Sequence, residues 1–287
     1  MATLRDIRRR IASIHNTQQI TKAMKMVAAA KLRRAQERII EARPYATKLR
    51  EVLGSLSLRT EPKRHPLLSR REVRRVELMP VSADRGLCGA FNQNVFRATE
   101  RFVRENQDVY ESITLSVVGR KASDYFSRRD YSIRKRYVQI FRTLTYETAS
   151  AVAAEVIEAY TGEVFDEIYL AYNEFRSAIS QRPVLTKLLP IDPLPVEPGY
   201  VATSYIYEPS DEEILETLLP RYVEFQIYRA FLESQASEQG ARMTAMGSAT
   251  GNAQEMLEKL TLHYNRARQA AITKELIDII GGAEALR

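Results

Sequence analysis

The feature that most constrains the fold is a long run of apolar residues, spaced three or four apart, at the start of the chain. The spacing holds from Leu4 to Leu56, apart from a polar interval between Ile14 and Met24. Such a pattern is typical of a coiled-coil seam, because only one face of the helix then needs a partner. A helix over residues 3–57 would be about 80 Å long, far longer than a domain of this size requires. The predicted seam residues are Leu4, Ile7, Ile11, Ile14, Met24, Val27, Lys31 (through its aliphatic stem), Ala35, Ile39, Ala42, Ala46, Leu49, Leu53 and Leu56.

Two details of this helix are expected to depart from regularity. The step from Ile14 to Met24 breaks the heptad phase, so the winding of the supercoil should change near residues 17–21. Pro44 lacks an N–H and crowds the preceding turn, so it should bend the helix a few residues before itself.

A second long helical pattern runs from about residue 212 to residue 281 at the other end of the chain. Ser210 or Asp211 can cap its first turn. Pro220 is expected either to kink its start or to separate a short leading helix. The Ala-rich stretch 241–253 would let a second helix approach closely. The predicted seam comprises Leu215, Leu219, Tyr222, Gln226, Ala245, Ala249, Asn252, Met256, Leu260, Tyr264, Ala267 and Ala271.

These patterns predict a division of the chain into three segments. Residues 1–58 and 209–287 are expected to form a long antiparallel coiled coil, and residues 59–208 a central domain. In that domain strand and helix candidates alternate, which predicts a doubly wound, Rossmann-like, mostly parallel α/β sheet. The strand candidates are residues 73–82, 113–119, 133–140 and 167–175, the helix candidates are residues 90–105, 120–129 and 146–161, and residues 183–190 add a further extended segment.

Positive charge is concentrated in the first helix. Residues 1–50 contain thirteen Lys and Arg residues against three acidic residues, whereas the formal net charge of the whole chain is only +7. A solvated helix face, a nucleic-acid surface and a partner protein with acidic patches would each explain this distribution. The aromatic residues that interleave with basic ones in single-strand readers are missing from this segment.

The most enzyme-like segment is the turn at residues 82–92, after the first predicted strand, where doubly wound folds place ligands. It contains only Gly86 and Gly89, so it lacks the three-glycine dinucleotide fingerprint, and no Walker-type phosphate loop occurs in the sequence. His15, His65 and His263 are scattered, and Cys88 is the only cysteine. We therefore expect no catalytic residue, no metal and no cofactor, although a nucleotide-binding enzyme remains the first alternative and a coiled-coil nucleic-acid-binding protein the second.

The chain closely resembles the F-type ATP synthase gamma subunits of bacterial type. The resemblance is carried by residues 20–32, by 84–92 with the run Asp-Arg-Gly-Leu-Cys-Gly, and by 262–276, and it continues through 272–285. It implies a non-catalytic central-stalk rotor shaft that couples proton flow through the c ring to ATP synthesis or hydrolysis at the beta subunits, by rotation within the alpha/beta hexamer. The implied partners are three alpha and three beta subunits, epsilon and the c ring, with no nucleic acid and no membrane span. The implied location is peripheral, on the cytoplasmic face of the bacterial cell membrane.

The resemblance also implies contact residues, by matching positions. Met24 and Lys25 would face the acidic lever of a beta subunit, and residues 277–286 would turn in an apolar sleeve. On periodicity alone such side chains are more simply a solvated helix face. The implied contacts to the alpha/beta ring are Met24, Lys25, Arg242, Arg268, Gln269 and Thr273, and those of the foot near the c ring are Tyr205, Tyr207 and Glu208.

Overall fold

A computed structural model describes residues 3–57, 65–192 and 210–284 of the chain. Its contacts divide the chain into two compact units. The globular unit contains residues 29–242, and the paired-helix unit contains residues 1–28 together with 243–287. Two helices, α1 (Leu4–Ser57) and α5 (Asp211–Glu284), have residues in both units. The three-segment division predicted from the sequence follows helices and strands rather than contacts, and it stays a prediction.

The globular unit is built on a five-stranded sheet in the order β3-β2-β1-β4-β5. Four of its strands are parallel, and the last pairs antiparallel with its neighbour, which confirms the predicted mostly parallel α/β fold. The central strand is buried along nearly its whole length, as expected for a strand covered on both faces. The strands are β1 (Arg75–Pro80), β2 (Ser112–Val118), β3 (Ile133–Tyr137), β4 (Glu167–Phe175) and β5 (Gln181–Leu189).

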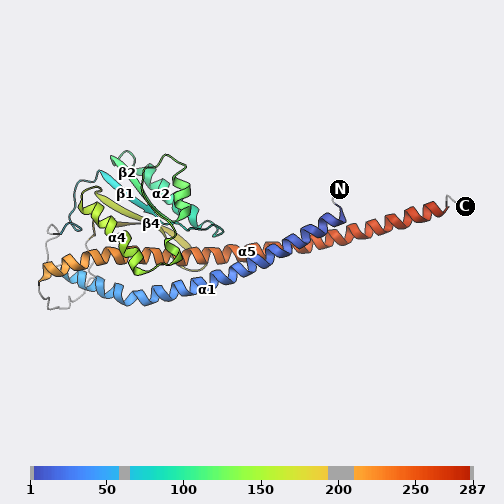
Figure 1. Cartoon of the computed structure of the whole chain (residues 1–287), viewed down its shortest axis with the longest axis horizontal. Coiled ribbons are helices and arrows are strands. Elements are labelled where there is room, and N and C mark those ends of the chain that lie inside the picture. The colour runs from blue at the N-terminus through green and yellow to red at the C-terminus, as the bar shows by residue number, and fades with distance from the viewer. Residues whose placement is uncertain (1–2, 58–64, 193–209, 285–287) are drawn as a thin grey trace. The chain divides into compact units, whose positions relative to one another are not determined.

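Helices cover both faces of this sheet (Figure 1). On one face, α2 (Phe91–Asn106) and α3 (Arg120–Phe126) pack on Leu78 and Leu115 through a cluster of aromatic and aliphatic side chains. On the other face, α4 (Tyr146–Thr161) packs with the globular-unit parts of α1 and α5 in a larger cluster. The helices at the two chain ends therefore contribute to the core of the globular unit itself.

The bounds of the elements follow the sequence closely where the pattern is strong. Helix α4 and strand β4 have the predicted bounds. Strand β3 is shorter than the predicted 133–140, because Gln139 has a left-handed backbone with φ 63° and a 3-10 helix, η2 (Ile140–Arg142), follows it. The segment near residues 183–190 is β5, which reaches β4 through the short turn 176–180.

Along α1 and α5, neither internal proline ends its helix. Pro44 lies inside α1 and Pro220 inside α5, so the prediction of a separate leading helix before Pro220 is wrong. Leu215 and Leu219 are buried, as predicted for the seam.

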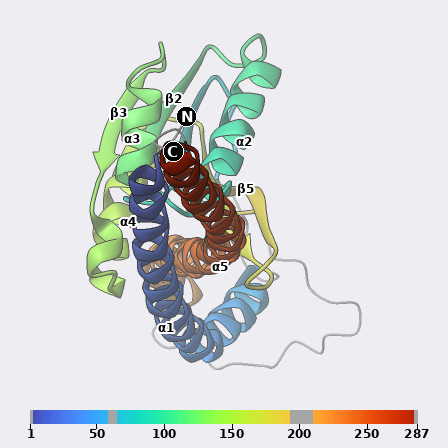
Figure 2. The ribbon, with the colours of Figure 1, turned by 90° about the vertical axis from the view of Figure 1, so that its right-hand side faces the viewer.

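The paired-helix unit is an antiparallel pair, with residue numbers rising along α1 as they fall along α5. Polar contacts join the helices: Arg8 Nη2 donates to Tyr264 Oη at 2.6 Å, Gln18 Nε2 to Gln254 Oε1 at 2.7 Å, and the Thr21 and Thr250 hydroxyls lie 2.8 Å apart. The N-terminal part of α1 lies beside α5 in both views (Figures 1 and 2). The predicted antiparallel pairing of the chain ends is confirmed.

The predicted seams are wrong by one position over part of their length. On α1, Val27 is 56% exposed and Lys31 is exposed, whereas Ala28 and Leu32 are buried. On α5, Asn252 is exposed and Met256 is 52% exposed, whereas Ala253 is buried. Both stretches are rich in Ala and Met, so two adjacent faces of the helix offer nearly equal apolar surface and the pattern cannot choose between them.

Polar side chains of the interval in α1 lie in the seam, which agrees with the interpretation of Gln18 and Thr21 as seam residues that fix the register. Gln18 is half-buried, and Thr21 is only 9% exposed and bonded across the pair to Thr250. The seam therefore continues through the interval on polar side chains, which supports a register-fixing role for them.

Candidate functional site

The loop that follows β1 is held tightly at the carboxyl edge of the sheet. The buried Ser82 hydroxyl accepts the N–H of Ala122 at 2.8 Å and donates to the Val118 carbonyl at 3.1 Å. Gly119 has φ +88°, and a Cβ there would lie 2.2 Å from the Ser82 carbonyl oxygen. Only glycine allows this close approach, so the loop and the start of α3 form one rigid edge.

The Asp84 carboxylate joins the loops that follow the first three strands. Its Oδ1 atom accepts the N–H of Arg120 at 2.9 Å and the N–H of Gln139 at 3.0 Å. Because these bonds use backbone donors, they fix the loops and leave the Arg120 guanidinium available. The same loops carry Arg85 and Arg142.

From α5, Arg242 reaches the same edge of the globular unit. Its Nη1 atom lies 2.6 Å from Oε1 of Glu238, and its Nη2 atom donates to the Gly86 carbonyl at 3.1 Å. The Arg242 side chain is only 12% exposed. Burial raises the pKa of Glu238, an effect that the Arg242 guanidinium opposes without cancelling. The sequence suggested Arg242 as a partner contact, and the structure places it in contact with its own chain.

Cys88 lies in the same loop and is buried. Asn92 Nδ2 donates to its sulfur at 3.3 Å. Burial raises the pKa of the thiol, although the nearby Arg242 charge opposes that shift. The protonated thiol that results is a poor nucleophile.

These elements enclose a pocket of about 700 Å³ whose lining is strongly basic, here called the basic pocket. It lies entirely within the globular unit. The uncharged lining residues include Ala35, Phe141 and Gln239. The cationic lining residues are Lys31, Arg34, Arg38, Arg85, Arg120, Arg142 and Arg242, against the two acidic residues Asp84 and Glu238. The sequence did not predict this pocket, because its lining residues come from widely separated segments of the chain. The concentration of Lys and Arg in residues 1–50 was a signal only for the part of the lining that α1 contributes.

In the paired-helix unit, Met24 is half-buried and Lys25 is exposed. The Lys25 side chain lies over Gly247, with its Cε atom 3.7 Å from where a Cβ would stand. Arg268, Gln269 and Thr273 are exposed on α5. Arg268 is about 30 Å further along that helix than Gly247, so the structure does not gather these predicted contacts into one site. The foot residues Tyr205, Tyr207 and Glu208 lie outside the described residues.

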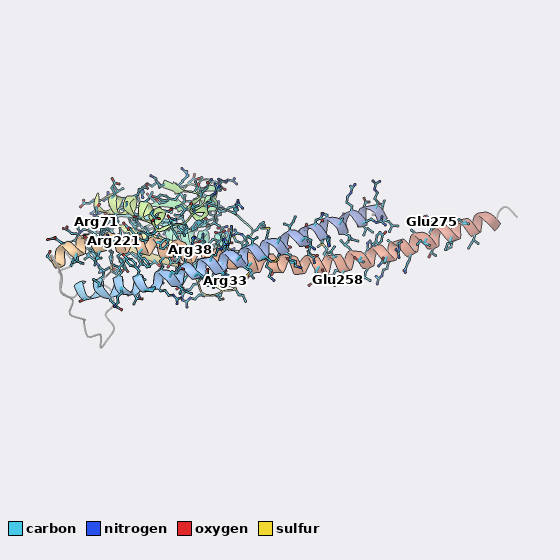
Figure 3. The ribbon with its side chains drawn as sticks, turned by 60° about the horizontal axis from the view of Figure 1, so that its bottom comes forward. Arg33, Arg38, Arg71, Arg221, Glu258 and Glu275 are labelled. Carbon is cyan, nitrogen blue, oxygen red and sulfur yellow. The ribbon has the colours of Figure 1, made fainter. Side chains whose placement is uncertain are left out.

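The last described turns of α5 form an apolar tip. Here α5 continues past the start of α1, and Glu275 lies on this stretch (Figure 3). Every residue from 272 to 280 is exposed. The large apolar side chains of the tip are Ile272, Leu276, Ile277, Ile279 and Ile280, each at least 50% exposed.

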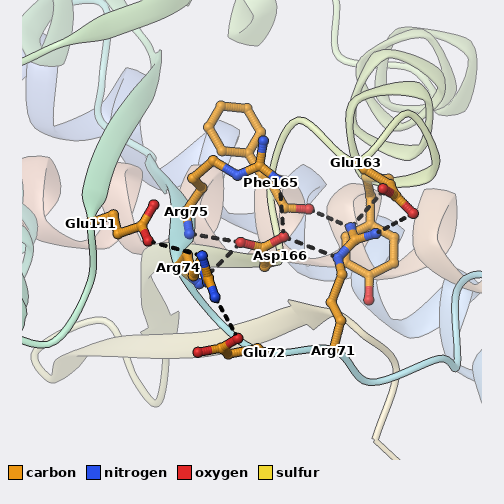
Figure 4. Close-up of polar contacts among 9 residues, drawn as sticks. Arg71, Glu72, Arg74, Arg75, Glu111, Glu163, Phe165 and Asp166 are labelled. Atoms are coloured by element: carbon orange, nitrogen blue, oxygen red, sulfur yellow. Dashed lines mark hydrogen bonds and ion pairs between the residues drawn. The ribbon is translucent and has the colours of Figure 1, made fainter.

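A second charged cluster lies near the amino end of β1, centred on the nearly buried Asp166 (Figure 4). Its carboxylate accepts the backbone N–H of Arg74 at 3.0 Å and of Arg75 at 2.8 Å, and it lies 3.1 Å from Arg71 Nε. Burial raises the pKa of Asp166, but the two N–H bonds and the Arg75 guanidinium outweigh burial, so the pKa lies below its ordinary value. Arg71 in turn donates to the Tyr160 carbonyl at 2.8 Å. The cluster ties the segment before β1 to the turn between α4 and β4.

Two observations bear on cofactors and membranes. Among the described residues, no group of three or more His, Cys, Asp or Glu side chains is placed to hold a metal ion. Within residues 3–57, 65–192 and 210–284, no helix is both long and apolar enough to span a bilayer.

Comparison with known proteins adds the family. Residues 3–286 match the family model described as ATP synthase. The ATP synthase gamma chain of Anaeromyxobacter sp. (strain Fw109-5) is 53% identical and that of Geobacter sp. (strain M21) is 51% identical, each alignment covering 100% of both chains.

Chains in solved structures of ATP synthases have a similar fold. A chain in the cryo-EM structure of the central stalk and c-ring of Tetrahymena thermophila mitochondrial ATP synthase matches 80% of this chain and 99% of its own length, with 30% identity and a TM-score of 0.62. A chain from the Euglena gracilis mitochondrial enzyme in rotational state 3 has a TM-score of 0.67 at 21% identity, covering 99% of this chain and 94% of its own. That second likeness concerns the fold alone. With full-length relatives at half identity and a sheet flanked by two long terminal helices, the chain belongs to the ATP synthase gamma chain family.

Proposed function

We propose that this chain is the central rotor shaft of an F-type ATP synthase, coupling proton flow through the c ring to ATP synthesis or hydrolysis at the beta subunits. The observation that carries this proposal is the apolar tip of α5. Five large apolar side chains on one unpaired stretch of helix need a cover, because contiguous exposed apolar surface in soluble proteins marks an interaction site. An apolar sleeve at the top of an alpha/beta ring would provide that cover.

The proposed mechanism follows from symmetry. A single chain inside a ring of three alpha and three beta subunits presents a different side to each beta subunit, so the three catalytic sites differ in conformation. Turning the shaft then shifts each site among its states, and by linkage hydrolysis in the ring turns the shaft in reverse. In this proposal the chain is a non-catalytic subunit, and the chemistry belongs to the beta subunits.

The proposed surroundings complete the assignment. The partners are alpha, beta, epsilon and the c ring, and the chain sits peripherally on the cytoplasmic face of the bacterial cell membrane. The exposed Lys25, Arg268, Gln269 and Thr273, with the half-buried Met24, are proposed contacts to the ring. Arg242 is proposed to act indirectly, by holding the loop at Gly86 in place. Tyr205, Tyr207 and Glu208 are proposed to face the c ring.

Two measurements test the proposal. A tagged chain should co-purify with alpha and beta subunits at one copy per three of each. Deleting the chain from Ile272 onward should impair coupling, measured as ATP-driven proton pumping per ATP hydrolysed, more than it impairs assembly, because the globular unit is left intact.

A matched pair of variants sharpens the test. Ile277→Ser with Ile280→Ser removes apolar surface from the tip and should lower coupling. Lys274→Ser with Glu275→Ser changes the same stretch without removing apolar surface and should leave coupling near the wild-type value. Failure of the tagged chain to bring down alpha and beta, or equal coupling in both double variants, would contradict the proposal.

A further inference from the structure

We propose that the basic pocket of the globular unit binds the polyphosphate group of a small anion. This inference goes beyond the shaft role, which assigns no ligand to this pocket. The proposed binding requires no catalytic residue, and it depends on arginine side chains rather than on the backbone of a glycine-rich loop.

The basic pocket carries positive charge that its own carboxylates do not compensate. Seven cationic side chains line the basic pocket against two carboxylates. One carboxylate, Glu238, already pairs with Arg242, and Asp84 is occupied by two backbone donors. Arg34, Arg85, Arg120 and Arg142 form no ion pair among the described residues, so no carboxylate placed there neutralises their charges. Like charges held this closely repel one another until an anion neutralises them.

The basic pocket also has the size and the position of a ligand site. A volume of about 700 Å³ is typical of small-ligand pockets. The pocket lies outside the carboxyl ends of the parallel strands, which is where open α/β sheets bind ligands. The bonds made by Asp84, together with the tight packing at Gly119, fix the loops that carry Arg85, Arg120 and Arg142. The arginines are thus mounted on a rigid frame before any ligand arrives.

The side chains that line the basic pocket favour phosphate over other anions. Guanidinium groups present paired N–H donors that match phosphate oxygens, and several phosphates in a row match cations arranged around a concave wall. The amide side chain of Gln139 adds a further donor to the lining, whereas the Nε2 atoms of Gln235 and Gln239 already donate to the Phe141 carbonyl and to Glu238. A single carboxylate or sulfate would neutralise only a fraction of the charge, so a polyphosphate fits better than a simple anion.

The experiment is isothermal titration calorimetry of the full chain at physiological salt with tripolyphosphate, ATP and adenosine as separate probes. Tripolyphosphate should bind once per chain, with an affinity that falls as salt rises. If ATP binds as tightly as tripolyphosphate, the phosphates alone are recognised, and if it binds more tightly, the physiological ligand is a nucleotide. Both results support the proposal.

Matched variants locate the site. Arg120→Gln with Arg142→Gln should weaken tripolyphosphate binding about tenfold to a hundredfold, because charge-assisted hydrogen bonds are lost. Arg128→Gln with Arg182→Gln removes the same charge from exposed positions outside the pocket and should change the affinity less than about twofold. None of the four side chains forms an ion pair among the described residues, so both variants should melt at the wild-type temperature.

Three outcomes would overturn the proposal. One is absence of tripolyphosphate and ATP binding, and another is equal weakening in the two double variants. The third is binding of a polyglutamate peptide with no binding of tripolyphosphate, which would make the basic pocket a docking face for an acidic protein segment. Because these measurements use the chain alone, they are independent of whether it assembles with alpha and beta.

Discussion

The two units use polar side chains in opposite ways. In the globular unit, charged groups are buried and bonded to several partners: Asp166 is held by three arginines, and the fully buried Glu77 is paired with Arg134 at 2.7 Å. In the paired-helix unit, neutral groups make the contact across the seam where the Thr21 and Thr250 hydroxyls lie 2.8 Å apart. Burying a charge makes its loss expensive, whereas a pair of neutral groups contributes little. The comparison indicates that the globular unit carries the stability of the chain and that the paired helices mainly present surface.

The largest effect should come from Asp166→Ala. Removing this carboxylate leaves Arg71, whose side chain is 28% exposed, without its main ionic partner, and leaves two N–H groups unsatisfied. The free energy of unfolding should fall by about 3–5 kcal/mol, measured by urea unfolding of the full chain. Asp192→Ala is the control: this carboxylate is 52% exposed and pairs with Arg70 at 3.0 Å and with Lys187 at 2.9 Å, and Lys187 keeps Glu167 as a second partner, so the loss should cost about 1 kcal/mol at most. Equal losses would break the comparison between buried and exposed charges.

The contribution of Asp166 should also depend on pH. Its folded-state pKa lies below the ordinary 3.8, so its stabilisation is complete above that value and is lost as the pH falls through the lower, folded-state pKa. The gap in unfolding free energy between the wild-type chain and Asp166→Asn should therefore be constant near neutral pH and shrink below pH 3.8. If the difference in unfolding free energy between the two chains increased as the pH fell, the predicted direction would be contradicted.

A smaller effect, opposite in the two units, is expected from two glycines. Gly119→Ala places a Cβ 2.2 Å from a carbonyl oxygen at a backbone conformation suited to glycine, and should destabilise by about 1–3 kcal/mol or more. Gly251→Ala in α5 meets nothing within 4 Å and should stabilise the helix by about 0.5–1 kcal/mol. Thermal unfolding of both variants gives the two signs, and a destabilising Gly251→Ala would mean that the helix pair is packed more tightly there than its contacts indicate.

The seam pair should respond differently to one substitution than to two. Thr21→Val leaves the Thr250 hydroxyl with only the Met246 carbonyl of its own helix as a partner and should cost up to about 1 kcal/mol, whereas Thr21→Val with Thr250→Val removes both hydroxyls and should be nearly neutral. Hydrogen exchange of the amides around Thr250 reports the local opening free energy. A double variant less stable than the single would mean that the bonds of these hydroxyls to the Gln18 and Met246 carbonyls contribute to stability.

The smallest effect is expected for Arg33→Ala on α1. Arg33 and Glu37 are 83% and 53% exposed and lie one helical turn apart at 3.0 Å (Figure 3 labels Arg33). Removing the pair should change the unfolding free energy by no more than about 0.5 kcal/mol, and less at high salt. A larger change in the free energy of urea unfolding would mean that Arg33 makes a further stabilising contact.

Much of the fold could be predicted from the sequence because its signals are local. Strand β4 is rich in β-branched and aromatic residues, and α4 begins directly after Thr145, whose hydroxyl accepts the N–H of Thr148. Both elements have the predicted bounds. The seam error at Val27 and Ala28 has a different origin, since an alanine-rich helix has no strongly apolar face to follow. The side to which β5 pairs also has no local signal, as it depends on the turn that returns the chain to β4.

The candidate sites were less predictable, for a physical reason. The apolar tip of α5 is continuous in sequence and could be anticipated. The basic pocket is not, because Arg34, Arg85, Arg120 and Arg142 become neighbours only after the sheet has formed. The inward role of Arg242 was equally hidden, since no periodicity distinguishes an exposed arginine from one bonded to a distant carbonyl.

One contact on α5 has a mechanical consequence. A Cβ at Gly240 would lie 3.3 Å from the backbone of Ala178 in the β4–β5 turn, and two residues later Arg242 holds the loop at Gly86. Both attachments come just before Met243, where the paired-helix unit resumes. Because α5 touches the β4–β5 turn and the Gly86 loop within three residues, this stretch of the helix cannot shift without displacing both loops of the globular unit.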